Sequence, residues 1–270
     1  MNELKKYELT AETKSYAGRT LYRIRALRDF GNVRKGDLGG FVGSESNLSQ
    51  KETCWVYGSA EVYGSAEVFG SARVYDSAEV FGSARVYDSA EVYNSAEVYN
   101  SAVVFGSARV YGLAEVFGLA RVYGSARVYG SAEVYNSAVV FGSARVYGSA
   151  EVFGSARVYG SAEVYNSARV YGSAEVFGSA EVFGSARVCG EAEVTKATDV
   201  FTVAPIGSRD DTTTFYKAKD GKIFVKCGCK NTDIDTWLDM VQETHGDNKR
   251  GKAYRLAAQI AKLQILGKED

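Results

Sequence analysis

The sequence predicts an all-β solenoid followed by a small α+β domain, and three observations support this prediction. One six-residue phrase, V-Y-G-S-A-E with small variations, repeats from Val56 to Val194 in 23 steps without a shift in register. Within each phrase the four residues A-E-V-Y alternate apolar with charged or aromatic side chains, as expected of a short β-strand. After Pro205 the repeat is replaced by one hairpin pattern and two helix patterns. A repeat this short is typical of a solenoid.

The first, second, fifth and sixth positions of the hexad predict the inside and the outside of the solenoid. The first residue is Val and the fifth is Ala throughout, whereas the sixth is Glu or Arg except at Val103 and Val139. The second residue is Tyr or Phe as far as Phe183. Because charged groups cannot be buried in every coil, we expect Val and Ala to face the interior, and the charged and aromatic side chains to face outward.

The third position of the hexad predicts where the chain turns. From Gly58 to Gly190 it holds only Gly, Asn or Asp, residues that share a tolerance for left-handed backbone angles. The fourth residue is Ser except at Leu113, Leu119 and Glu191, and a Ser hydroxyl can bond to the local backbone. Each hexad is therefore expected to form one strand and one corner.

The number of hexads in one coil is left open by the pattern alone. Sampling the aromatic position every eighteen residues from Tyr57 gives tyrosine as far as Tyr165, but sampling every twelve also gives an all-Tyr column. An aliphatic residue followed four positions later by a small one resembles the hexapeptide repeat of left-handed β-helices. Those proteins prefer a small or acidic residue where this chain has Tyr or Phe. The resemblance implies a left-handed parallel β-helix with three hexads in each coil.

We expect three domains: an N-terminal β cap over residues 1–40, the hexapeptide-repeat β-helix over 41–201, and an α+β head over 202–270. In the first of these, alternation around Tyr7 and from Thr20 to Leu27, with Gly18 between, predicts a pair of antiparallel strands. A bare solenoid end exposes apolar core and unpaired strand edges, so a cap is the simplest role for this segment. The stretch that follows, as far as Trp55, is interpreted as an irregular first coil.

The N-terminal third carries a more specific resemblance. The segments RTLYRIRALRDFGNVRKGDLGGFV and NLSQKETCWVYGSAEV are similar to those of YdcK-like proteins, which are bacterial and phage-borne and have been labelled transferases because of their β-helix. The resemblance covers the cap and most of the repeat. It implies a single-stranded left-handed β-helix and supplies no catalytic residues. The segment after residue 205 resembles C-terminal segments common in phage-encoded proteins, which implies a phage or prophage origin.

The head is predicted to have a ββαα order. Residues 212–217 and 222–226 read as two strands joined by a turn at Asp220-Gly221. A first helix follows, with Thr232 as its expected N-cap, Trp237 on its apolar face and Gly246 at its end. A second helix is expected over residues 249–266.

Several residues of the head are candidates for binding. Cys227 and Cys229 lie on one face of a strand end, and with His245, the single histidine of the chain, they are weak candidates for a metal site. Small core-filling thiols and a helix-capping histidine explain them more simply, so neither metal nor cofactor is expected. Contacts to a partner are expected in the polar loop and nearby side chains, namely Ser208, Arg209, Asp210, Trp237 and His245.

The charged position of the hexad, sampled every eighteen residues, predicts faces of opposite charge. One column is acidic from Glu61 to Glu151 and another is mostly basic. Like charges one strand apart repel, so the acidic column is expected to need partners outside its own coil. The outward aromatic residues are expected to expose more apolar surface than a monomer tolerates. The residues expected to form the assembly faces are Glu79, Glu97, Glu115, Glu133, Arg109, Arg127, Arg145, Tyr111 and Tyr129.

Composition narrows the class of protein. With 32 basic and 33 acidic residues the formal net charge is −1, which gives no bulk attraction to nucleic acid or membrane. No stretch is long and apolar enough to cross a bilayer, the first residues do not have a signal-peptide pattern, and the four Cys form no disulfide framework. A cytoplasmic location is expected, that of the host if the chain is phage-encoded, with virion association left open.

These observations predict a non-enzymatic structural or interaction protein. We expect a homotrimer, because an acidic and a basic face on one triangular coil can close a head-to-tail ring, with the head contacting a host or phage protein. One alternative is a hexapeptide-type acyl or nucleotidyl transferase. It is disfavoured because residues 41–201 contain no histidine and no loop interrupts the hexads. The other alternative is a phage inhibitor that binds a host protein through its charge rows.

Overall fold

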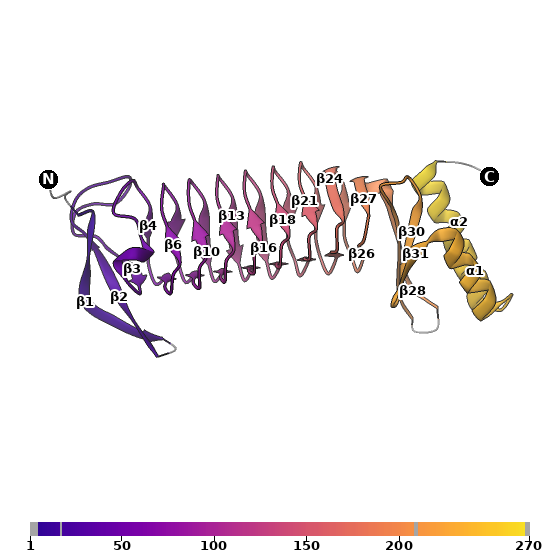
Figure 1. The fold of residues 1–270 in the computed structure, drawn as a ribbon, viewed down its shortest axis with the longest axis horizontal. Helices are drawn as coiled ribbons and strands as arrows, with labels where there is room; N and C mark the ends of the chain where they lie inside the picture. The colour runs from indigo at the N-terminus through magenta and orange to yellow at the C-terminus, as the bar shows by residue number, and fades with distance from the viewer. Residues whose placement is uncertain (1–4, 17, 208–209, 268–270) are drawn as a thin grey trace. The chain divides into compact units, whose positions relative to one another are not determined.

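The protein is a β-solenoid that continues into a C-terminal α+β domain (Figure 1). The computed structural model describes residues 5–16, 18–207 and 210–267. The chain forms two compact units, Met1–Ser143 and Ala144–Asp270, and each is described by itself below. The division lies inside the repeat, whereas the domain boundaries predicted from the sequence follow its changes of pattern.

The described residues of the first unit contain three sheets of stacked parallel strands. An antiparallel hairpin, β1 (Tyr7–Tyr16) and β2 (Arg19–Ala26), joins one end of the first sheet. That first sheet continues through β3 (Leu38–Val42), β5 (Glu61–Val62), β8 (Glu79–Val80), β11 (Glu97–Val98), β14 (Glu115–Val116) and β17 (Glu133–Val134). The second contains β4 (Trp55–Val56), β7 (Arg73–Val74), β10 (Glu91–Asn94), β13 (Arg109–Gly112) and β16 (Arg127–Gly130). The third contains β6 (Glu67–Val68), β9 (Arg85–Val86), β12 (Val103–Val104), β15 (Arg121–Val122) and β18 (Val139–Val140).

The strand register decides how many hexads form a coil. Val92 is the parallel partner of Val110 and of Val74, so neighbouring coils are offset by eighteen residues. The prediction of three hexads per coil is confirmed, and the twelve-residue alternative is excluded. Each coil is hydrogen-bonded to the next, as where the backbone N–H of Glu97 donates to the carbonyl of Ala114 at 3.0 Å.

The interior is built from the first and fifth hexad positions, as predicted. The described Val residues at the first position and Ala residues at the fifth are almost all completely buried, for example Val92, Ala96 and Val98 at 0% exposure. The residues between them along a strand point outward because successive side chains alternate across a β-strand. A β-branched residue paired with a very small one fills a narrow coil without voids.

The corners adopt the left-handed backbone conformation that the third position predicts. Asn94 has φ 61° and Gly112, eighteen residues further along the same column, has φ 80°. A Cβ added to Gly112 would lie 3.0 Å from the backbone nitrogen and oxygen of Gly130 in the next coil. At this position glycine therefore serves both the turn and the close stacking of coils.

The N-terminal segment covers the first coil, with the antiparallel strand pair that the sequence predicts. A short 3-10 turn, η1 (Glu45–Asn47), follows β3. Lys6 is completely buried, and its ammonium group donates to the carbonyls of Cys54 at 2.9 Å and Lys51 at 3.1 Å. Burial lowers the pKa of Lys6. Two backbone carbonyls of the irregular coil thus accept from a buried cation.

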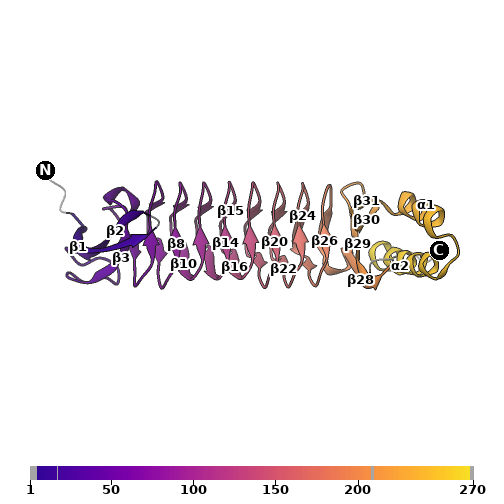
Figure 2. The same ribbon diagram turned by 90° about the horizontal axis from the view of Figure 1, so that it is seen from below.

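The second unit continues the same pattern with strands of the same kind (Figure 2). Val164 is the parallel partner of Val182, again eighteen residues away. One sheet here contains β20 (Glu151–Val152), β23 (Arg169–Val170) and β26 (Arg187–Val188). The other two contain β19 (Arg145–Val146), β22 (Glu163–Val164) and β25 (Glu181–Val182), and β21 (Arg157–Val158), β24 (Glu175–Ser179) and β27 (Glu193–Lys196). The 3-10 turn η2 (Ala197–Asp199) ends the repeat.

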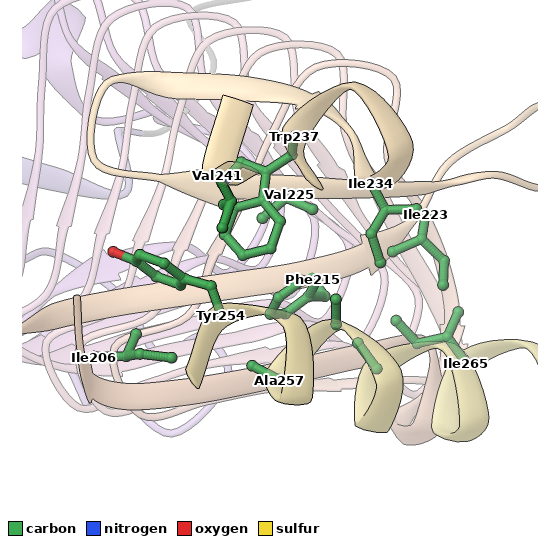
Figure 3. Close-up of a cluster of buried hydrophobic side chains, with 12 residues drawn as sticks. Ile206, Phe215, Ile223, Val225, Ile234, Trp237, Val241, Tyr254, Ala257 and Ile265 are labelled. Carbon is green, nitrogen blue, oxygen red and sulfur yellow. The ribbon is translucent and has the colours of Figure 1, made fainter. Parts of the chain in front are cut away.

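The C-terminal domain, called the head below, is an antiparallel sheet covered by helices. Its strand order is β28 (Val200–Ile206), β29 (Asp211–Lys217), β30 (Ile223–Cys227) and β31 (Lys230–Asp233). The helices are α1 (Ile234–His245) and α2 (Lys249–Leu266). Phe215 packs edge-on against Trp237 of α1 in the core drawn in Figure 3, with ring centroids 5.4 Å apart.

The opposite face of the head sheet covers the last coil of the solenoid. The hydroxyl of Thr214 accepts a hydrogen bond from the backbone N–H of Arg187 at 3.0 Å. The hydroxyl of Tyr216 lies 3.4 Å from the sulfur of Cys189. Alternation along β29 therefore divides its side chains between two tasks, with Phe215 in the helix-facing core and its neighbours on the solenoid.

Two strands of the head were not predicted. β28 contains Pro205, and β31 has the polar sequence KNTD, so neither shows the alternation expected of a strand. Both are edge strands, where proline and polar residues are tolerated. The predicted helix cap was also wrong by one residue: Asp233, not Thr232, is the N-cap of α1, and its carboxylate accepts from the N–H of Thr236 at 2.9 Å.

We expect Gly112→Val to lower the free energy of unfolding by about 1–3 kcal/mol, because a β-branched residue is strained at positive φ. Gly112→Asn should be milder, since Asn94 occupies the same column at φ 61°. The check is chemical denaturation of the full chain followed by circular dichroism. Equal losses for the two variants would contradict the role of this corner.

Candidate functional site

The acidic column predicted from the sequence exists as a ladder of carboxylates in the first unit. Neighbours in this ladder, called the acidic row below, are parallel-strand partners one coil apart. Its members are Glu61, Glu79, Glu97, Glu115 and Glu133. Like charges at this spacing repel one another unless other groups compensate them.

The basic column lies on the second sheet. Arg109 of β13 is the strand partner of Arg127 of β16, and the rings of Tyr111 and Tyr129 on the same strands stack with centroids 4.9 Å apart. Arg145, predicted as part of the same face, is in the second unit, where its guanidinium donates to Glu163 at 3.1 Å.

The outward aromatic residues form stacked ladders. Ring planes one coil apart are nearly parallel, as for Tyr93 and Tyr111, whose centroids are 4.8 Å apart at an interplanar angle of 4°. Stacking covers both faces of each ring, and the ladder residues from Tyr57 to Phe177 are buried or half-buried. Phe183, near the end of the repeat, is 52% exposed. The expectation of a broadly exposed aromatic surface was therefore wrong, because it did not allow for ring-on-ring stacking.

Tyrosine hydroxyls compensate some of the carboxylates, a feature that the sequence interpretation missed. Tyr63 donates to Glu79 at 2.9 Å and Tyr99 donates to Glu115 at 2.7 Å, in each case sixteen residues further along the chain. The same contact recurs in the second unit, where Tyr159 donates to Glu175 at 2.9 Å. The available signal was the alternation of Tyr and Phe every eighteen residues along one column.

Glu97 lacks this compensation. The residue sixteen positions before it is Phe81, which has no hydroxyl, and Glu97 makes neither a hydrogen bond nor an ion pair with the residues that the structure describes. Partial burial raises the pKa of the Glu97 carboxyl, and the charges of Glu115 and Glu79 raise it further. The acidic row thus carries negative charge that its own coil does not neutralise.

The basic column likewise contains a charge that has no ion-pair partner. Glu91 is nearly buried and pairs with Arg73 and, at 3.1 Å, with Arg109. Arg127, the next in the column, has no ion pair within the described part of the chain. The first unit therefore presents an uncompensated carboxylate on one sheet and an uncompensated guanidinium on another.

Two exposed leucines single out one coil of the repeat. Leu113 and Leu119 replace the usual Ser at the fourth hexad position, and each is 64% exposed. They lie at the two ends of the segment that carries β14, so they bracket Glu115 of the acidic row. A large exposed apolar side chain contributes little to a corner, and both leucines lie in the coil next to that of Glu97.

The candidate binding residues of the head differ in how deeply their side chains are buried. Trp237 is 3% exposed and packs against Phe215 and Tyr254, so its side chain belongs to the core (Figure 3). The ring of His245 lies against Tyr254, with centroids 5.7 Å apart. Asp210 is exposed. Ser208 and Arg209 lie outside the described residues.

A small cavity brings the two cysteines of the head together. It has a volume of about 140 Å³ and is lined by Ile206, Asp211, Thr212, Thr213, Cys227, Gly228, Cys229 and Tyr254. The hydroxyl of Thr213 donates to the sulfur of Cys227 at 3.3 Å. His245 is not part of this lining. Among residues 5–16, 18–207 and 210–267, no three His, Cys, Asp or Glu side chains gather closely enough to hold a metal ion.

No known family model matches the sequence, and no curated protein matches it. Within the described part of the chain, neither α1 nor α2 has the length and apolar character needed to cross a membrane.

We expect Glu97→Gln to stabilise the protein near neutral pH. The folded-state pKa of Glu97 is raised above its ordinary value, so ionisation of this group weakens the folded state as the pH rises through that pKa. The gain should shrink as the pH falls into the range where the wild-type carboxyl is protonated. Thermal unfolding midpoints measured from neutral to acidic pH test this expectation.

Glu115→Gln is the matched control, because Glu115 has the same strand position but accepts a hydrogen bond from Tyr99. It should give less stabilisation or a loss. A Glu97→Gln variant that is no more stable than wild type at neutral pH would refute the uncompensated charge.

Proposed function

We propose that this protein is a non-enzymatic structural and interaction protein whose solenoid self-assembles through faces of opposite charge. The observation that carries the proposal is the acidic row with its uncompensated Glu97, together with the exposed Leu113 and Leu119 that bracket Glu115 in the next coil. Arg127 and the stacked tyrosines on the second sheet form a complementary face on the same unit. A carboxylate such as Glu97 gains a partner when such a face of another copy is brought against it.

The proposed assembly is a homotrimer. Each copy has one acidic and one basic face, so the contact joins two different surfaces and propagates head to tail. A coil with three sheets favours closure of such a contact after three copies. The leucines give the contact its position along the repeat, since the surrounding hexads carry Ser at the same place. Apolar side chains that become buried at the centre of a charged interface add affinity that charge pairs alone do not supply.

The head is proposed to contact a further protein, of host or phage origin. The sequence of residues 207–211 and of residues 244–248 is polar and contains glycine, and polar segments near the connections of a regular scaffold commonly carry recognition. A trimer would present three heads and increase binding through avidity. The similarity of the N-terminal segments to YdcK-like proteins supports a left-handed, phage-related β-helix. The four Cys, which form no disulfide framework, support a cytoplasmic location.

The first test of the proposal is the mass of the full chain in solution. We expect three copies, or a multiple of three, to associate at micromolar concentration in low salt, and this threefold association to be lost in high salt, because exposed charges are screened. Arg127→Gln should weaken the threefold association at low salt. Restoring the usual serine with Leu113→Ser and Leu119→Ser should do the same. Sedimentation velocity measures both.

Glu67→Gln is the control for this experiment, since Glu67 is exposed on the third sheet, outside both proposed faces. It should leave the mass unchanged. A monomeric wild type in low salt would contradict self-assembly and would leave the charge rows available to bind another protein instead.

The second test separates the head from the solenoid. Full-length protein is used to capture partners from a bacterial lysate, and a chain lacking residues 206–270 is compared with it after its fold is checked by circular dichroism. We expect the shortened chain to lose capture of the specific partner. Equally tight capture by the shortened chain would assign binding to the charged and aromatic faces.

A further inference from the structure

The helix α2 buries small residues and exposes large apolar ones, which is the opposite of the usual arrangement. Four of its six buried residues are Gly or Ala: the buried residues are Gly251, Tyr254, Ala257, Ala258, Ala261 and Ile265. Its exposed face carries large ones, called the α2 stripe below: Leu256 at 60% exposure, Ile260 at 51%, Leu263 at 49% and Leu266 at 41%. Figure 3 shows Tyr254, Ala257 and Ile265 directed toward the sheet. A helix that needed only to cover the head sheet would gain nothing from leucine on its outer face.

The spacing of the stripe is that of a helix-pairing seam. Leu256, Ile260 and Leu263 follow one another at intervals of four and three residues. This is the a and d pattern of a coiled coil, with isoleucine at a and leucine at d. Ala253 continues the spacing one step toward the N-terminus, and its side chain is half-buried against the head core. The stripe is therefore shaped to receive another helix.

The chemistry around the stripe favours a partner with an uncharged face. The exposed residues Gln259 and Gln264 between its members are neutral, and Lys262 pairs with Asp235 at 3.2 Å. Lys252, which is exposed four residues before Leu256, places a positive charge at the N-terminal end of the stripe. From Leu256 to Leu266 the stripe therefore offers no unpaired charge that would attract an acidic or basic partner surface. A second copy of α2 supplies the same neutral apolar face.

The end charges of α2 decide its orientation against that copy. Its first turn begins with Lys249 and Arg250 and has no acidic residue, and its last turn has no basic residue. This charge order opposes the helix dipole, because cations stabilise the C-terminal end and destabilise the N-terminal end. In an antiparallel pair, the cations of each helix lie beside the C-terminal end of the other. A parallel pair would place cations against cations.

We propose that the α2 stripe is a docking surface for α2 of a second copy of this chain, packed antiparallel. With a and d positions in alternating layers, Leu256 lies against the second copy's Ile260, and Ala253 lies against its Leu263. In the same register, the helix start at Lys249 meets the helix end at Gly267. The contact is self-complementary, so it closes as a symmetric dimer and does not extend. It is independent of the charged solenoid faces.

The experiment measures association of the full chain in high salt, where the contact between charged faces is screened and an apolar contact persists. Ile260→Glu should raise the dissociation constant of the dimer by at least about ten-fold. Thr244→Glu, which adds the same charge to the exposed face of α1, should leave it unchanged. Because both residues are exposed, both variants should keep the wild-type circular dichroism spectrum.

The variant Lys249→Glu distinguishes antiparallel pairing of α2 from a purely structural role of the stripe, because only pairing predicts opposite effects on monomer stability and on association. An acidic residue at the helix start improves the interaction with the dipole, so the thermal midpoint of the monomer should rise. The same change removes the cation beside the second copy's helix end, so the dimer should weaken. Effects of opposite sign on stability and association are expected only from antiparallel pairing.

Disulfide trapping fixes the orientation directly. In a Cys229→Ser background, chains carrying Ala253→Cys are mixed with chains carrying Leu263→Cys and oxidised mildly. We expect cross-links between the two kinds of chain, whereas in a parallel pair these positions lie about 15 Å apart along the helix axis. A chain that is monomeric in high salt, or an Ile260→Glu variant that associates as wild type does, overturns the proposal. Cross-links within one kind of chain only would overturn the antiparallel orientation.

Discussion

The in-register stacking of coils eighteen residues apart is the constraint on which the rest of the structure depends. Because each strand of the repeat pairs with its counterpart one coil away, each side chain of the repeat lies above a side chain from the same hexad position. A position must therefore hold a residue that tolerates its own kind as a neighbour. Valine and alanine do so in the interior, glycine and asparagine do so at corners with positive φ, and aromatic rings do so by stacking.

Charged residues meet this constraint least easily, because stacking brings like charges together. The chain relieves the repulsion in several ways. Glu91 is placed between Arg73 and Arg109, Glu61 pairs with Lys14 of the N-terminal hairpin, and other carboxylates accept from tyrosine hydroxyls one coil away. Glu97 has none of these. The negative charge of Glu97, which the repeat does not neutralise, remains available for a contact with another molecule. The proposed assembly is based on this unpaired charge.

The sequence predicted the periodic features well, since periodicity is a property of a pattern. The buried Val and Ala positions, the corners and the order of hairpin and helices all followed from residue types at fixed spacing. The length of a coil was open because twelve- and eighteen-residue samplings both gave a tyrosine column, and only the pairing of Val92 with Val110 excludes the shorter one. The resemblance to hexapeptide repeats had favoured the same answer.

The sequence predicted contacts between side chains poorly, because these depend on geometry that a pattern does not contain. The stacking of rings, and thus their partial burial, requires knowledge of which residue lies one coil away. The hydrogen bond from Tyr99 to Glu115 spans sixteen residues and becomes recognisable only when the coil length is known. In the head, Trp237 was expected to contact a partner although the sequence places it on the apolar face of its helix, and in the structure that face is buried in the core. Edge strands such as β31 carry too few apolar residues to be recognised.

The places where the chain departs from its own local rules carry most of the functional argument. Leucine replaces serine at two corners of one coil, and α2 buries alanine while it exposes leucine and isoleucine. Neither departure improves the packing of the unit in which it occurs, and departures of this kind are expected at functional surfaces. The two surfaces differ in physics: the first is mainly electrostatic and weakens with salt, and the second is apolar and does not. A chain with both can form a ring through one surface and join rings through the other, since a head-to-tail contact and a symmetric pair combine without using the same residues.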